Sequence, residues 1–110
     1  MKIQLLHIAD CPNARAARRM LDEALRELGL LEEILEIEVC DSAHAEQLAF
    51  PGSPTIRIDG KDVETISSGQ GGYGVSCRTY VIDGRRRGVP AQEIISKALR
   101  SAVAAADKEK

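Results

Sequence analysis

The pattern of apolar residues in the first 39 positions is compatible with few folds. Apolar side chains occupy both faces of residues 3–8, which is typical of a strand that is covered on two sides. Residues 12–28 repeat apolar side chains at spacings of three and four, so they predict an amphipathic helix. Residues 34–39 alternate and predict a second strand. Together they predict two parallel strands joined by a right-handed helical crossover.

The rest of the chain extends this unit to a small α/β domain. We expect a short helix at residues 43–49 and strands at residues 55–58 and 77–82. A closing helix is expected from Pro90 onward. Asp59-Gly60 is a hairpin-type turn, whereas residues 83–88 predict a solvated loop. The predicted order is β-α-β-α-β-β-α, a four-stranded mixed sheet flanked by helices. It forms a single domain of residues 1–110, with 105–110 as a frayed tail.

Composition narrows the class of protein. A length of 110 residues, 44% hydrophobic and 29% charged, is typical of one ordinary soluble domain. The formal net charge of -2 argues against nucleic acid as a partner. No apolar run approaches the roughly 18 residues that span a bilayer, and no signal pattern opens the chain. With three cysteines, an odd number, we expect reduced thiols and a cytoplasmic protein.

Cys11 lies at the turn between the first strand and the first helix. The first-turn amides of a helix have no partner within the helix, and its positive dipole end favours a thiolate. Arg15, one turn further along, adds positive charge. Because the thiolate is the nucleophile of thiol chemistry, Cys11 is the candidate catalytic residue. A buried structural cysteine is the alternative.

Four short sequence motifs resemble those of a known group of proteins. They are Asp10-Cys11-Pro12-Asn13, Phe50-Pro51-Gly52-Ser53-Pro54-Thr55, Asp59-Gly60 and Cys77-Arg78-Thr79-Tyr80. In these motifs and their order, the chain resembles small bacterial thioredoxin-like proteins, some of which are labelled alkylmercury lyase. The resemblance extends from Ile3 to about Val103. It implies a thioredoxin-like fold, with a cis peptide bond before Pro54 that faces Cys11.

Residues beside these motifs are the expected substrate-binding positions. Because Pro54 has no N–H, we expect the backbone of Ser53 to be accessible for pairing with a peptide or thiol substrate. Pro12 and Asn13 adjoin Cys11 in the chain. Arg78, like Arg57, is suited to hold an oxyanion or the carboxylate of glutathione. His7 alternates with Ile3 and Leu5 and is expected to be a core histidine rather than a general base.

Position 14 is alanine, so the second cysteine of a Cys-X-X-Cys motif is absent. Three resolving thiols remain open: Cys77, Cys40 and a small thiol such as glutathione. The resemblance favours Cys77, which belongs to a shared motif and follows a glycine-rich segment at 69–74. Cys40 ends the second strand at the same sheet edge as Cys11. A disulfide needs Cα atoms within about 7 Å, which the sequence does not establish for either pair.

Three functional hypotheses follow. The favoured one is a thiol-disulfide oxidoreductase in which Cys11 attacks and either Cys77 or a small thiol resolves, acting on a protein or low-molecular-weight thiol. The second is a non-enzymatic module that binds a thiophilic metal such as mercury, or a protein partner. The third is an oxyanion reductase resembling arsenate reductases. No cofactor is expected, and two distant histidines predict no zinc site. The outer strand edges would allow an oligomer.

Overall fold

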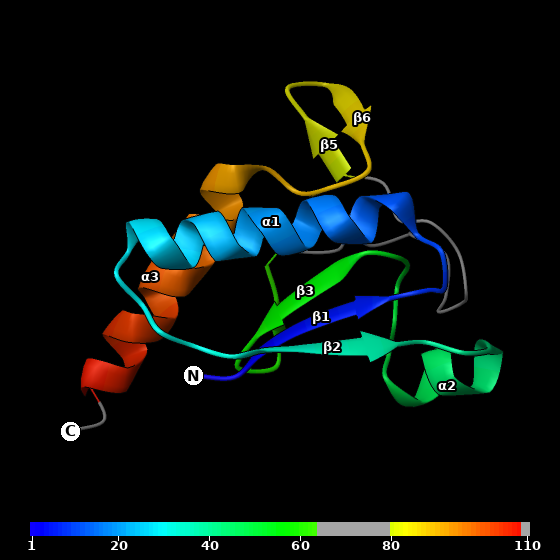
Figure 1. Cartoon of the computed structure of the whole chain (residues 1–110), viewed down its shortest axis with the longest axis horizontal. Coiled ribbons are helices and arrows are strands. Elements are labelled where there is room, and N and C mark those ends of the chain that lie inside the picture. The colour runs from blue at the N-terminus through cyan, green and yellow to red at the C-terminus, as the bar shows by residue number, and fades with distance from the viewer. Residues whose placement is uncertain (64–79, 109–110) are drawn as a thin grey trace.

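The computed structural model describes residues 1–63 and 80–108, which form an α/β fold (Figure 1). The elements are β1 (Ile3–His7), α1 (Pro12–Glu27), β2 (Ile34–Glu38), α2 (Ser42–Gln47), β3 (Thr55–Ile58), β4 (Lys61–Asp62), β5 (Tyr80–Ile82), β6 (Arg85–Arg87) and α3 (Gln92–Lys108). The strand, helix and strand predicted for the first 39 residues are confirmed, since β1 and β2 pair in parallel on either side of α1 in the chain.

The main sheet is four-stranded and mixed, as the sequence predicted. Its strand order is β2-β1-β3-β4, with β3 antiparallel to both β1 and β4. The helices α1 and α3 lie across one face of this sheet (Figure 1). Their apolar stripes bury a core between them and the strands, formed by Ile3, Leu5, Ala17, Leu21, Ala24, Leu25, Ile56, Ile58, Ile95 and Leu99.

A smaller cluster packs on the other face, near the carboxyl ends of β1 and β2. It is formed by Leu6, Val39, Ala45 and Phe50. The short helix α2 supplies Ala45 and is held at its start by Asp41, whose Oδ1 accepts a hydrogen bond from the backbone N–H of His44 at 2.8 Å. This cluster fixes the segment that leads from α2 toward Ser53.

The prediction that residues 77–82 supply the fourth strand of the main sheet was wrong for Tyr80–Ile82, and its residues 77–79 lie outside the described residues. That strand is β4, reached through the predicted Asp59-Gly60 turn, whose φ values are 52° and 82°. Residues Tyr80–Ile82 instead pair with β6 in a separate two-stranded sheet. Asp83 and Gly84, with φ of 52° and 78°, form a second turn of the same kind, so β5 finds its partner locally. The solvated loop predicted at 83–88 therefore contains a strand.

The closing helix α3 continues to Lys108, so residues 105–108 are helical where a frayed tail was expected. Gln92, at its start, donates through Nε2 to the carbonyl of Met20 in α1 at 2.9 Å, which ties the two helices together. No helix within the described ranges has both the length and the apolar character needed to cross a bilayer.

Gly88, which follows the β5–β6 hairpin, packs against Asn13 at the start of α1. A Cβ at position 88 would lie 2.8 Å from Oδ1 of Asn13 and closer still to the rest of its amide. We expect Gly88→Ala to destabilise the fold by about 1–2 kcal/mol, because the Asn13 side chain must move. In an Asn13→Ala background the same substitution should cost clearly less, which a double-mutant cycle from urea denaturation measures. Equal costs in both backgrounds would show that this contact does not exist.

Candidate functional site

Cys11 opens α1 at the carboxyl end of β1. Asp10 before it has φ of 57°, a conformation that Asp tolerates better than most residues, and it turns the chain from strand to helix. Cys11 is the N-cap residue of α1, and its carbonyl accepts a hydrogen bond from Ala14 N at 3.2 Å. Its side chain makes no capping hydrogen bond, and the residue is only 9% exposed. Pro12, the first residue of the helix, is exposed.

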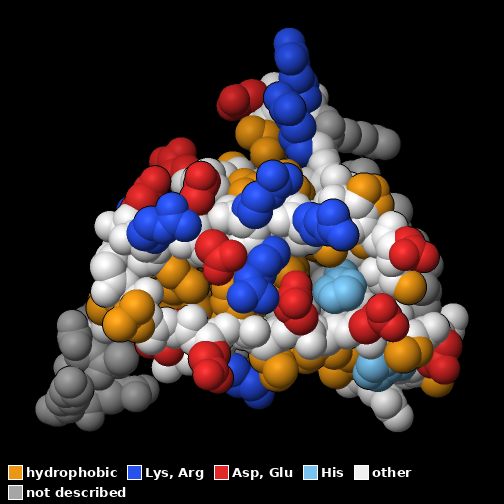
Figure 2. Space-filling model, in the orientation of Figure 1, with side chains coloured by type: hydrophobic (Ala, Val, Ile, Leu, Met, Phe, Trp, Pro, Cys, Tyr) orange, Lys and Arg blue, Asp and Glu red, His pale blue; other side chains and the backbone are white. Residues whose placement is uncertain are grey.

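A hollow of about 640 Å³ adjoins this thiol. Its lining comes from the end of β1, the first two turns of α1 and the edge strand β2, namely His7, Asp10, Cys11, Ala14, Arg15, Arg18, Arg19 and Glu36. Basic and acidic side chains both lie over α1 on this face of the molecule (Figure 2). The hollow therefore combines one thiol with several charged groups of both signs.

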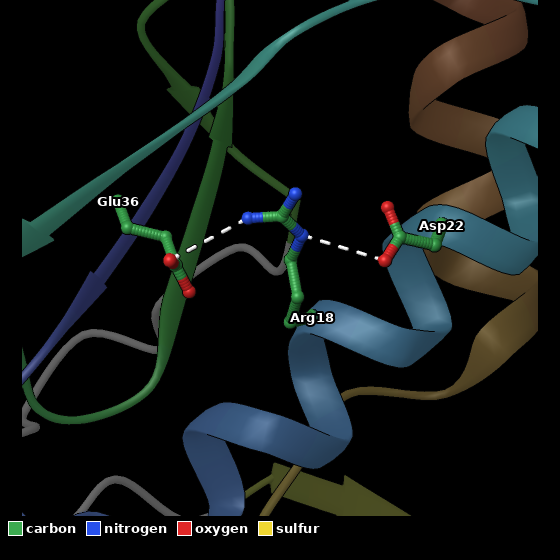
Figure 3. Close-up of polar contacts among 3 residues, drawn as sticks. All are labelled: Arg18, Asp22 and Glu36. Atoms are coloured by element: carbon green, nitrogen blue, oxygen red, sulfur yellow. Dashed lines mark ion pairs between the residues drawn. The ribbon is translucent and has the colours of Figure 1, made fainter.

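Arg18 carries the ion pairs of this surface (Figure 3). Its Nη1 lies 3.5 Å from Oε2 of Glu36, and its Nε lies 3.4 Å from Oδ2 of Asp22. Nε is itself buried and makes no hydrogen bond of good geometry. Because all three side chains are 39–48% exposed, we expect each pair to add at most about 1 kcal/mol to stability. Their main effect is to hold the Arg18 guanidinium between α1 and β2.

His7 is not the core histidine that the sequence predicted. It is half-buried and lines the hollow beside Cys11. Ile3 and Leu5, on the same strand face, are covered by the helices, whereas His7 lies at the strand end where this cover stops. Its Nδ1 lies 3.1 Å from the Ile8 carbonyl and donates to it in the tautomer that is protonated at this nitrogen.

The segment around Pro54 is joined to the end of β1 by hydrogen bonds. Ser53 Oγ accepts from the backbone N–H of Ile8 at 3.1 Å, and the Tyr80 hydroxyl donates to the Pro54 carbonyl at 2.6 Å. Thr55 Oγ1 donates to the Gly52 carbonyl at 2.6 Å. The Ser53-Pro54 peptide bond is cis.

The expectation that the Ser53 backbone is accessible was wrong. Ser53 and Pro54 are fully buried. The contacts with Ile8 and Tyr80 hold this segment inside the fold, a tertiary effect that the local sequence does not show. Ser53 therefore positions the loop against β1 instead of offering a free edge to a peptide.

The chain matches no protein-family model, no curated protein and no solved structure.

Two of the predicted site residues, Cys77 and Arg78, lie outside the described residues. Arg57 is described, and its Nη2 donates to the Ala49 carbonyl at 2.8 Å beyond the end of α2. It does not line the hollow, so its predicted role at the thiol is not supported. Asn13 packs on Gly88.

Cys40 follows β2 at the same sheet edge as Cys11. The Val39 N–H donates to the His7 carbonyl at 2.7 Å, which places the ends of β1 and β2 side by side. Cys40 is an exposed free thiol whose Sγ is 3.7 Å from the Glu38 carbonyl, whereas Cys11 is a buried free thiol. Within residues 1–63 and 80–108, no three Cys, His or acidic side chains converge as a metal site would require.

Sequence reasoning missed four charged or titratable residues of the hollow: His7, Arg18, Arg19 and Glu36. Arg19 is four residues after Arg15 and thus shares its helix face, a signal that the sequence did contain. Glu36 lies beside Leu5 in the parallel register, which only the strand pairing reveals. The hollow thus depends on how α1 is rotated over β1 and β2.

Proposed function

We propose that this chain is a thioredoxin-like thiol-disulfide exchange protein with Cys11 as its nucleophile. One observation carries the proposal: Cys11 begins α1 with a side chain that makes no capping bond, and it lines an open hollow. A cysteine at the start of a helix, beside unpaired backbone amides, is a position at which the nucleophilic cysteines of thiol enzymes occur. The strand order β2-β1-β3-β4, with a cysteine between β1 and α1, also supports a thioredoxin-like arrangement.

The proposed chemistry has two balanced steps. The Cys11 thiolate attacks one sulfur of a substrate disulfide, forms a mixed disulfide and releases the other sulfur as a thiolate. A second thiolate then attacks the mixed disulfide, forms a new disulfide with the substrate or with Cys11, and releases the remaining sulfur. Cys77 is our proposed resolving thiol, on the motif resemblance. Cys40 and a small thiol are the alternatives.

Site-resolved alkylation by iodoacetamide tests this proposal. We expect Cys11 of the folded, reduced protein to react at least about tenfold faster than Cys40 at neutral pH, because a catalytic cysteine is the more reactive thiol of its protein. Exposure alone predicts the reverse order, since Cys40 is exposed and Cys11 is 9% exposed. Mass spectrometry of the separate peptides gives both rates.

The unfolded protein in denaturant is the control, and there the two cysteines should react at similar rates. If Cys11 reacts no faster than Cys40 in the folded protein, the proposed nucleophile is wrong. Repeating the reaction on oxidised protein then identifies the resolving thiol, because that cysteine loses reactivity together with Cys11.

A further inference from the structure

We propose that the hollow beside Cys11 selects small substrates that carry a carboxylate, through Arg15 and Arg19. The inference rests on the proposed function of Cys11 and adds the class of substrate: low-molecular-weight disulfides or thiols with an anionic group close to sulfur. Both arginines are exposed, and both line the hollow that contains the thiol.

The charges of the hollow are unevenly paired. Arg18 is held by Glu36 and Asp22, whereas Arg15 and Arg19 form no ion pair with any residue that the structure describes. Arg15 and Arg19 are four residues apart on one helix, a spacing at which like charges repel. An anion bound between them would relieve this repulsion and form charge-assisted hydrogen bonds with the guanidinium groups.

The carboxylates of the hollow only partly offset the positive charge of Arg15 and Arg19. Glu36 is engaged by Arg18, so Asp10 is the carboxylate of the lining left to face Arg15 and Arg19. The backbone amides at the start of α1 add further partial positive charge next to Cys11. The site is therefore cationic, in a protein whose formal net charge is -2.

The size and surroundings of the hollow favour a small molecule over a peptide. A volume of about 640 Å³ lies in the range of about 300–1,000 Å³ that small-molecule sites occupy. An extended peptide would need a free backbone edge beside the thiol, and Ser53 and Pro54 are buried. Arg15 and Arg19 instead provide two exposed guanidinium groups that can reach a ligand in solution.

Two alkylating reagents of similar size test the proposal, the anionic iodoacetate and the neutral iodoacetamide. We expect the ratio of the iodoacetate rate to the iodoacetamide rate to be about fivefold higher at Cys11 than at Cys40. A factor of this size corresponds to the energy of one close interaction between unit charges in water. Cys40 is an internal control, because Glu38 and Asp41 flank it in the chain. The excess at Cys11 should shrink as salt is added.

The double variant Arg15→Gln with Arg19→Gln should remove most of the excess at Cys11. Arg26→Gln, an exposed arginine in the last turn of α1, is the matched control and should preserve it. The same comparison applies to disulfides, with anionic 5,5′-dithiobis(2-nitrobenzoate) and neutral 2,2′-dithiodipyridine as the pair. In each pair the ratio cancels any general loss of thiol reactivity in the variant.

Two results would overturn the proposal. One is a ratio of anionic to neutral reagent rates that is the same at Cys11 and at Cys40. The other is a ratio at Cys11 that the double variant leaves unchanged in either reagent pair. Failure of the proposed function has a different signature: Cys11 then reacts no faster than Cys40 with the neutral iodoacetamide alone. The two inferences therefore fail in different measurements.

Discussion

Cys11→Ser is expected to reduce thiol-disulfide exchange to the background rate of the assay. A serine hydroxyl does not ionise near neutral pH, so it provides no nucleophile for attack on a disulfide, although its shape is close to that of the thiol. The fold should persist, because Cys11 makes no side-chain capping hydrogen bond. Exchange with a chromogenic disulfide measures the loss, and far-UV circular dichroism checks that the variant is folded.

Cys40→Ser and Cys77→Ser are the matched controls for this experiment. Each removes one thiol and leaves the first step, attack by Cys11, intact. If Cys77 resolves, Cys77→Ser should accumulate a mixed disulfide on Cys11, while Cys40→Ser should turn over normally. Accumulation in Cys40→Ser instead would assign resolution to Cys40, and accumulation in neither would assign it to a small thiol. Exchange that survives Cys11→Ser would show that Cys11 is not the nucleophile.

Much of the fold follows from the sequence because its signals are local. The spacing of apolar residues in 12–28 specifies a helix with one buried face, and α1 buries Leu21 and Leu25 on that face. Asp59-Gly60 likewise specifies a tight hairpin by its backbone requirements alone. Asp83-Gly84 carries the same signal, and giving it equal weight would have predicted the β5–β6 hairpin.

The site was less predictable because it depends on contacts between distant segments. Cys11 and Ser53-Pro54 stand out in the sequence, yet the hydrogen bond between Ile8 and Ser53 joins residues 45 positions apart. The burial of Ser53 and the placement of His7 in the hollow both follow from such contacts. Sequence patterns identify which residues are reactive by type, whereas packing decides which of them solvent can reach.

Phe50→Ala is expected to lower the free energy of unfolding by about 3–5 kcal/mol, the usual cost of removing a buried phenylalanine ring. Phe50 is fully buried in the cluster with Leu6 and Val39, and its N–H donates to the Ala45 carbonyl at 2.8 Å. A loss of this size is a large part of the 5–15 kcal/mol that typical domains possess. Urea denaturation at low temperature, where the variant still folds, measures it.

Leu31→Ala is the matched control, since it truncates an apolar side chain that is 101% exposed. We expect a change within about 0.5 kcal/mol for this variant. A similarly small change for Phe50→Ala would mean that the cluster under α2 does not pack as described. Because Phe50 lies three residues before Ser53, a loosened cluster should also weaken the bond from Ser53 to Ile8. Faster hydrogen exchange at the Ile8 amide would then link this distant packing to the position of the loop beside Cys11.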